Sequence, residues 1–297
     1  MFERVAVYVR PDPVLFALVL IGGWTYWRAY RRARDDGRRR TVSPWRARAF
    51  ALGLAVLAVA FLSPLDWLGT RLLSANFAGM FLATMVAPPL MQLGQPLTLL
   101  FRAADPESRR RLRRAYRGRV ATILTFPVAT WLLFAVVTYL WQFSSLTEWA
   151  VRWPALRTLQ HLSLFFVAWL FWWPALCSDP VRWRMGYTLR IFYVLVEMTH
   201  KGLFGGMFLA AQTPFHEEIA AKLPSWAPDP MVDQRLAILI LWVGGSLVFF
   251  AAIVGIARHW VLYDARYSRR LDRRLAKQRE AERRRRAALE QIFRRPV

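Results

Sequence analysis

The chain has 297 residues, of which 56% are hydrophobic and 15 are tryptophan, yet its formal net charge is +23. Soluble domains are about 45–50% apolar, so one soluble globule cannot account for both values, and charged and apolar residues must be separated into blocks. A membrane protein with apolar spans and basic loops has this composition. The single cysteine, Cys177, excludes an intramolecular disulfide and a CxxC metal site, so any metal chemistry would rest on His, Met or carboxylate.

Seven apolar segments follow one another along the chain and predict an all-α, polytopic membrane protein with seven transmembrane helices. The first segment lacks the basic start and small-residue cleavage site of a signal peptide, so we expect it to be retained. Residues 1–260 are predicted to form the transmembrane domain. The expected spans are 13–27 (extendable to 30), 49–68, 72–94, 120–142, 157–177, 188–212 and 235–257.

The connections between the segments alternate in arginine content. Those after the first, third, fifth and seventh segments are rich in arginine, whereas those after the second, fourth and sixth are poor in it. By the positive-inside rule, the N-terminus is predicted outside and the C-terminus in the cytoplasm. Every connection agrees with this orientation.

The third segment carries polar and sulfur-bearing side chains on one predicted helical face. Spacings of four, four and seven place them there, namely Asn76, Met80, Thr84 and Met91. Pro88 and Pro89 remove two backbone donors and should break or kink the helix near its far end. In a membrane such a stripe usually faces a bundle interior and is a candidate for function.

Met80 and His161 are the candidate metal ligands. Asn76 and Met80 lie about one and two turns below the predicted outer surface, and His161 lies at a similar depth on the fifth segment. A thioether and an imidazole together suit Cu(I). A buried methionine alone is more often packing, and a lone histidine near an interface is often merely hydrogen-bonded.

The sixth segment carries Glu197, His200 and Lys201 at i, i+3 and i+4, on one side of the helix. An internal Glu197–Lys201 ion pair would neutralise the cost of burying both charges in a membrane. His200 is a further possible ligand or a proton-handling group. Gly202, Gly205 and Gly206 are expected to let another helix approach closely.

Four further polar residues flank the predicted spans. Asp66 and Asp233 are expected at the outer mouth of the bundle, where they polarise it or cap helices. His216 is expected outside the membrane and solvated, with a weak metal-gathering role as its alternative. His259, beside Trp260, is expected to anchor the inner interface.

Residues 261–297 are predicted to form a basic, helical cytoplasmic tail. From Asp264 onward the chain has thirteen Lys or Arg and five acidic residues in mixed order. A cationic helix lying on anionic membrane lipids explains this composition. No nucleic-acid partner is expected.

Three parts of the chain resemble the CtaG family of bacterial cytochrome c oxidase assembly factors. These are SANFAGMFLATMVAPPLMQLG, LQHLSLFFVAWLFWWPAL and DQRLAILILWVGGSLVF, and the resemblance covers about residues 13 to 260. It implies a multi-pass protein of the bacterial plasma membrane, with cytochrome c oxidase subunits as partners and delivery of copper to the oxidase as its role in respiratory chain biogenesis.

The chain departs from the family pattern at two places. The third span of the family begins with two histidines separated by three residues, and Asn76 and Met80 stand there in this chain. His161 matches the histidine of the fifth span, but a second histidine shortly before it is replaced by the Leu156–Arg157 region. Asparagine is a poor copper ligand and methionine a reasonable one for Cu(I), so the site is either retuned or lost.

No Gly-rich phosphate loop, HExxH motif or Ser/His/Asp set occurs in the sequence, so no enzymatic activity is expected. Three hypotheses remain open. The first is an oxidase assembly factor that holds Cu(I) on the outer side. The second is a metal-free scaffold for complex assembly, and the third is a small-solute or proton transporter that uses Glu197, His200 and Lys201.

Overall fold

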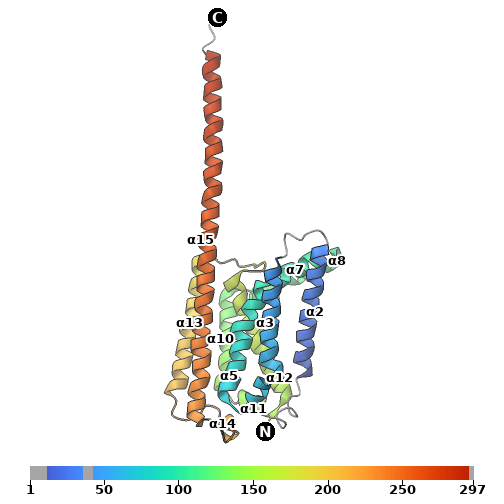
Figure 1. Cartoon of the computed structure of the whole chain (residues 1–297), viewed down its shortest axis with the longest axis vertical. Helices are drawn as coiled ribbons and strands as arrows, with labels where there is room; N and C mark the ends of the chain where they lie inside the picture. Colours follow the sequence, from blue (N-terminus) through green and yellow to red (C-terminus); the bar gives the residue numbers. More distant parts are fainter. Residues whose placement is uncertain (1–11, 36–42, 294–297) are drawn as a thin grey trace. The chain divides into compact units, whose positions relative to one another are not determined.

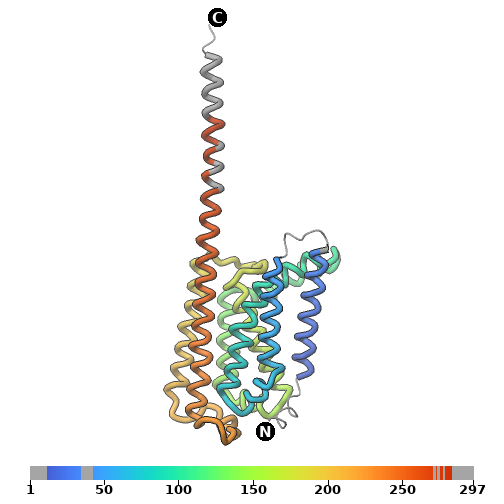
Figure 2. The backbone as a smooth tube through the Cα atoms, in the orientation of Figure 1, coloured from blue at the N-terminus to red at the C-terminus, as the bar shows by residue number. Residues whose placement is uncertain are grey.

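The computed structural model describes residues 12–35 and 43–293, and this part of the chain is helical with no strand (Figures 1 and 2). The all-α prediction is confirmed. Expectations on residues 1–11 and on the centre of the first basic connection, residues 36–42, lie outside the described residues. The chain divides into two compact units, Met1–Ala252 and Ile253–Val297.

Helices of very different length make up the described chain. Their bounds are α2 (Pro13–Asp35), α3 (Pro44–Leu62), α4 (Pro64–Leu68), α5 (Leu73–Phe81), the π-helix η2 (Leu82–Val86), α6 (Ala87–Leu93), α7 (Pro96–Ala103), α8 (Pro106–Arg117), α9 (Arg119–Leu124), α10 (Pro127–Phe143), α11 (Leu146–Arg152), α12 (Pro154–Leu176), α13 (Tyr187–Ala210), α14 (Glu217–Ala221) and α15 (Pro230–Phe293).

Within the described residues, four helical stretches are long and apolar enough to cross a membrane. A fifth is counted if α10 and α11, which meet at a bend of 67°, form one broken span. The molecule therefore has the helices of a membrane protein. The four stretches are Pro44–Leu62, Leu73–Leu93, Pro154–Leu176 and Pro230–Arg269.

Prolines divide two of the predicted segments. The second ends as a helix at Leu62, and Ser63 then caps the short helix α4 by accepting a hydrogen bond from the Leu65 amide at 3.1 Å. The fourth is broken between α9 and α10, because Pro127 occupies the first turn of α10. The prediction of one continuous helix was wrong for both segments.

The third predicted segment is a helix whose middle turn is widened. The π-helix η2 lies between α5 and α6, directly before Pro88 and Pro89, and the helix then continues through both prolines to Leu93, so it is distorted beside the prolines and not broken as predicted. Pro88 has no N–H to donate to the carbonyl of Thr84. The indole Nε1 of Trp172 on α12 donates to that carbonyl instead, at 3.0 Å.

The widened turn also changes which face the last residues present. Met91 was predicted on the same face as Met80, but it lies in a different part of the core. Its backbone is so close to α3 that a Cβ on Gly53 would stand 2.8 Å from the Met91 amide nitrogen. The prediction of one continuous stripe was therefore wrong beyond Thr84.

Helix α12 lies between two hydrophobic clusters of the first unit. One cluster joins α2, α3, α6 and α7 around Tyr26, Phe50 and Met91. The other joins α5, α10, α13 and α15 around Phe77, Phe204 and Phe208. Figure 1 shows α2, α3, α5 and α12 running side by side, and Figure 2 follows the same backbone from blue to red. Helix α12 therefore contributes to both clusters, with Phe165 packed against the first and Leu164 inside the second.

Acidic residues distant in sequence cap two helices. Asp233 of α15 accepts from the backbone amides of Leu73 and Ser74, at 2.6 and 3.3 Å, and so caps α5. Asp179 caps α7 by accepting from the Thr98 amide at 2.8 Å, and burial raises the pKa of this carboxyl. These links hold the helices of the first unit in register.

Candidate functional site

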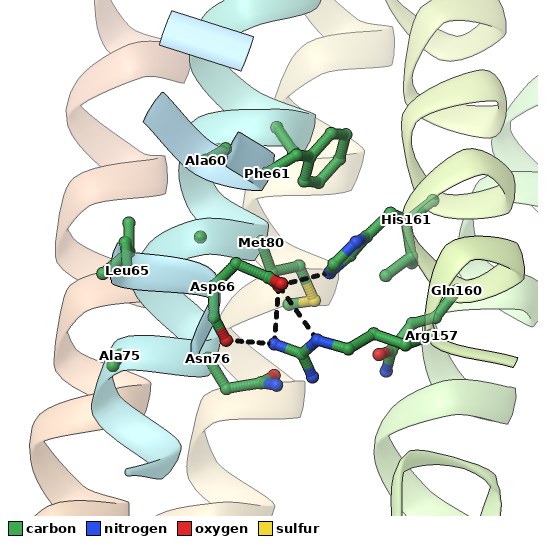
Figure 3. Close-up of a pocket in the computed structure, with 13 residues that line it drawn as sticks. Ala60, Phe61, Leu65, Asp66, Ala75, Asn76, Met80, Arg157, Gln160 and His161 are labelled. Atoms are coloured by element: carbon green, nitrogen blue, oxygen red, sulfur yellow. Dashed lines mark hydrogen bonds and ion pairs between the residues drawn. The ribbon is translucent and has the colours of Figure 1, made fainter. Parts of the chain in front are cut away.

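A small cavity of about 20 Å³ lies between α3, α4, α5 and α12. Most of its wall is apolar, but six polar or sulfur-bearing side chains also line it (Figure 3). A cavity needs roughly 10–15 Å³ to hold one water molecule, so this one has room for a single ion or water. The six residues are Asp66, Asn76, Met80, Arg157, Gln160 and His161.

Asp66 is the centre of the cavity's polar contacts. Arg157 and His161 are four residues apart on α12, so both side chains lie on the helix face toward Asp66. Arg157 donates from Nε and Nη2 to Asp66 Oδ1 at 2.9 and 2.6 Å, and His161 Nε2 lies 3.2 Å from the same oxygen. Figure 3 shows these side chains converging from α4 and α12. The carboxylate therefore neutralises the arginine and orients the imidazole.

The imidazole of His161 is fixed on its other sides. Its ring stacks on Phe61 of α3, with centroids 4.4 Å apart, and the side chain is 13% exposed. Its Nδ1 is buried and has no hydrogen-bond partner in the described part of the chain. A neutral imidazole carries one donor and one acceptor nitrogen, and Nε2 is the nitrogen that faces the cavity carboxylate.

Met80 brings the sulfur into the same cavity. It is buried on α5, and its Sδ accepts a hydrogen bond from Nε2 of Gln142 at 2.8 Å. Its neighbour Asn76 donates from Nδ2 to the carbonyl of Gly69 at 3.1 Å. The asparagine thus supports the connection between α4 and α5, while the thioether stays directed at the cavity.

The structure brings Asn76, Met80, Asp66 and His161 together, as their predicted depths require. His200 does not line this cavity. It lies on α13 between the rings of Trp131 and Tyr139, with centroid distances of 5.3 and 5.2 Å. His161 and His200 therefore belong to separate polar sites.

Glu197, His200 and Lys201 form the second polar site. Lys201 Nζ lies 3.7 Å from Glu197 Oε1, and His200 Nδ1 lies 3.2 Å from Glu197 Oε2. The glutamate is fully buried and the lysine 4% exposed. The Lys201 ammonium also lies over the Phe134 ring, 4.7 Å from its centroid. The predicted internal ion pair is present in this geometry.

The glycines of α13 differ from one another. Gly205 packs against the Trp242 indole, where an added Cβ would stand 3.2 Å from ring atoms, so the expected close approach is found there. An added Cβ on Gly206 would meet nothing within 4 Å. The expectation was wrong for Gly206.

Asp233, predicted at the outer mouth, and His216, predicted outside the membrane, have clear positions. Asp233 is a helix cap, one of its two predicted roles. His216 was expected to be solvated, but it is only 3% exposed, and this burial lowers its pKa to about 4. The expectation failed because Ile219 of the following short helix is itself packed into the core.

Three functional-site residues were missed from the sequence, namely Arg157, Gln160 and Gln142. Arg157 carries a detectable signal, because a charged residue one turn before a histidine in an apolar helix needs a partner. The partner, Asp66, lies on another segment. Gln160 donates to Thr147 at 3.0 Å, and its Oε1 is buried without a partner in the described residues.

The donor set of the cavity is suited to a soft ion. No group of three or more His, Cys, Asp or Glu side chains suitable for a metal occurs among the described residues. A site at Asp66 and His161 therefore depends on the Met80 thioether as a third donor. Imidazole and thioether ligands fit Cu(I) better than Mg²⁺ or Ca²⁺, which prefer oxygen.

A family comparison covers most of the chain. The model of the cytochrome c oxidase caa3 assembly factor family matches residues 24–262. The chain belongs to this family. The matched residues include every helix that lines the cavity, so the polar site lies within the part of the chain that the family shares.

Mycobacterial proteins are similar over most of the chain. An uncharacterized protein of Mycobacterium leprae is 26% identical over 273 residues, which are 89% of this chain and 41% of the relative. An uncharacterized protein of Mycobacterium tuberculosis is 27% identical over 281 residues, or 91% of this chain and 42% of the relative. The chain spans about two fifths of the length of these curated relatives. No solved structure matches it.

Proposed function

We propose that this chain is a non-enzymatic cytochrome c oxidase assembly factor that binds Cu(I) in the cavity between Asp66, Met80 and His161 and passes it to an oxidase subunit. The observation that carries the proposal is the meeting of a thioether, an imidazole nitrogen and a carboxylate around a space of about 20 Å³. Membership of an oxidase assembly family supports the same role. The space suits an ion and is too small for an organic solute.

The contacts suggest how each residue takes part. His161 Nε2 and Met80 Sδ are the proposed copper ligands. Binding at Nε2 moves the imidazole proton to Nδ1 and replaces the contact with Asp66. Asp66 then offsets the copper charge while Arg157 keeps the carboxylate in place. A site with few ligands lets copper leave again, as delivery requires.

We also propose that the protein crosses a bacterial plasma membrane seven times, with its N-terminus outside and its C-terminus in the cytoplasm. Helices α2 and α13 have 23 and 24 residues, which gives each a length of about 35 Å at about 1.5 Å per residue. Both therefore match the thickness of a hydrocarbon core. The arginine-rich connections support the orientation, and it places Asp66 and His161 near the outer surface.

Copper quantification tests the proposal. Purified protein loaded with Cu(I) and a competing chelator should retain stoichiometric copper. The variants Met80→Leu and His161→Ala should lose it. Met91→Leu is the matched control, because Met91 is an equally buried methionine away from the cavity. Wild-type protein that retains no copper would support the metal-free scaffold instead. Retention as high in Met80→Leu as in Met91→Leu would show that the Met80 thioether is not a copper ligand.

A proton or small-solute path is the second candidate. The observation that favours it is the fully buried Glu197, whose two carboxylate oxygens have no hydrogen-bond partner in the described residues. Intramembrane carboxylates often relay protons. A flux into proteoliposomes that Glu197→Gln abolishes and Met80→Leu leaves unchanged would establish this activity.

The basic tail is proposed to lie on anionic lipids. Helix α15 continues to Phe293, which agrees with a helical tail. Each basic residue near an anionic surface contributes about 1 kcal/mol to binding. Vesicles with phosphatidylglycerol should bind a peptide of residues 261–297 more tightly than zwitterionic vesicles, with affinity falling as salt rises.

A further inference from the structure

Helix α8 carries an exposed face of arginines that the proposed function does not use. Six of its twelve residues are arginine, and none of the twelve is buried. Four of the exposed arginines are three, four and seven residues apart, so they share one side of the helix. We propose that this arginine face binds the phosphate groups of anionic phospholipids at the membrane surface. The arginine face consists of Arg110, Arg113, Arg114 and Arg117.

The arginine face has no counter-charge in the described part of the chain, where none of its members forms an ion pair with a carboxylate. The two other arginines of α8 are engaged. Arg111 pairs with Glu107 at 2.5 Å, and Arg109 donates to the carbonyls of Phe101 and Ala104 at 3.0 and 2.9 Å. Like charges three or four residues apart destabilise a helix. An anion from outside the protein therefore relieves a repulsion that the described residues leave in place.

Tyr116 attaches another side of α8 to the helix bundle. Its hydroxyl donates to the carbonyl of Pro180 at 2.9 Å, and its ring centroid lies 6.2 Å from that of Trp173 and 6.4 Å from that of Phe101. Figure 1 shows α8 at the end of the first unit where α2 ends and α3 begins. Because Tyr116 is the side chain that contacts the bundle, the exposed arginines remain accessible to molecules outside the protein.

Directly after α8 the exposed residues change from arginine to aliphatic side chains. Arg119 is exposed, and the side chains that follow it on α9, Val120 and Ile123, are 70% and 64% exposed. The half-exposed Trp183 lies at the same junction, because its indole Nε1 donates to the carbonyl of Thr122 at 3.1 Å. In a membrane protein, exposed aliphatic residues next to tryptophan and arginine mark the boundary between hydrocarbon and headgroups. This boundary places α8 at the level of the lipid phosphates.

A phospholipid fits this surface better than a nucleic acid does. Guanidinium groups bind phosphate oxygens through paired hydrogen bonds, and both partners carry phosphate. A nucleic acid would leave Val120 and Ile123 exposed to water, whereas a bilayer supplies the phosphates together with the hydrocarbon that covers these two side chains. Each basic residue near an anionic surface strengthens binding about fivefold. The four arginines therefore favour an anionic headgroup over a zwitterionic one.

Hydrogen exchange of the full chain tests this site. The protein is placed in nanodiscs of phosphatidylcholine, with or without phosphatidylglycerol, and exchange of peptides from residues 106–117 is followed by mass spectrometry. No burial protects α8, so anchoring of its arginine face should slow exchange about tenfold when phosphatidylglycerol is present. The slowing should fade as salt rises. Peptides of α11, which lies at the other end of the first unit (Figure 1), measure the general effect of an anionic surface and should change much less.

Three variants separate charge from helix structure. Glutamine at all four positions keeps the helix propensity but removes the charge, so it should abolish the slowing. Lysine at the same positions keeps the charge and should keep most of the slowing. The matched control is Glu107→Gln with Arg111→Gln, which removes an exposed ion pair of the same helix without changing the net charge and should behave as wild type. The glutamine variant is Arg110→Gln, Arg113→Gln, Arg114→Gln and Arg117→Gln.

Three results would overturn the proposal. The first is equal exchange of α8 in the two lipid mixtures once the change in α11 is subtracted. The second is slowing by soluble heparin in phosphatidylcholine nanodiscs with none from phosphatidylglycerol, which would make a soluble polyanion the partner. The third is a loss of slowing as complete with lysine as with glutamine, because the positive charge would then not be the determinant.

Discussion

Two polar sites in the first unit accommodate a carboxylate inside the helix bundle in different ways. At the Asp66 cavity, one carboxylate oxygen accepts from an arginine and a histidine, and a small empty space remains beside the sulfur of Met80. At Glu197, a fully buried carboxylate lies 3.7 Å from Lys201 and 3.2 Å from His200, without a hydrogen bond to either carboxylate oxygen in the described residues. The first arrangement leaves room for a ligand, whereas the second balances charge inside a packed wall.

The largest effect is expected from removing half of the Glu197 pair. Lys201→Met removes the ammonium group beside the buried Glu197 carboxylate, so the free energy of unfolding should fall by about 3–5 kcal/mol. Chemical unfolding in micelles measures the change. The double variant Glu197→Gln with Lys201→Met should recover most of the loss. If the double variant were as unstable as the single one, the pair would not be an electrostatic unit.

His216 shows what burial does to a histidine outside the spans. Its folded pKa of about 4 lies below its usual value of 6.5, so protonation favours the unfolded chain. Its contribution to stability is complete above pH 6.5 and is lost as the pH falls from 6.5 to 4, by about 3 kcal/mol at about 1.4 kcal/mol per pH unit. The difference between wild type and His216→Gln, followed by unfolding at several pH values, isolates this contribution. A difference independent of pH would contradict it.

Asp66→Asn should break the first site while leaving the second intact. The change weakens two charge-assisted contacts of Arg157 and one of His161, and the expected loss is about 2–3 kcal/mol. Unfolding in micelles measures it, and Cu(I) retention should fall in the same variant. Glu107→Gln is the control, because its pair with Arg111 is exposed and contributes about 0–1 kcal/mol. Equal losses of unfolding free energy in the two variants would show that the Asp66 pair contributes no more to stability than an exposed ion pair.

The smallest change in stability is expected for Met80→Leu. The side chains have similar volume, but the buried Gln142 amide loses the sulfur that accepts its hydrogen bond, so the free energy of unfolding should fall by about 1–2 kcal/mol. Copper retention should nevertheless be lost, because leucine has no donor atom. If Met80→Leu kept its copper, the role of Met80 would be packing alone and the residue would not be a copper ligand.

The sequence predicted the helical fold and the meeting of Met80 with His161, because periodicity and depth depend on local spacing alone. It did not predict that Arg157 and His161 share Asp66, since the rotation of α12 relative to α4 is set by packing across the whole bundle. The breaks before Pro64 and Pro127 were visible as residue types, but whether a proline bends or ends a helix depends on its neighbours. The expectation that His216 is solvated was wrong for the same reason, because distant side chains decide whether a connecting segment is buried.

The π-helical turn at Leu82–Val86 works as a one-residue insertion in the third span. One extra residue rotates everything after it by about 100° around the helix axis. That offset separates the thioethers of Met80 and Met91, which an uninterrupted α-helix would align within about 20°. A single-residue deletion in this turn would restore regular winding and leave Met91 against Gly53, so the face on which each methionine of this span lies is governed by helix winding as much as by the spacing of residues.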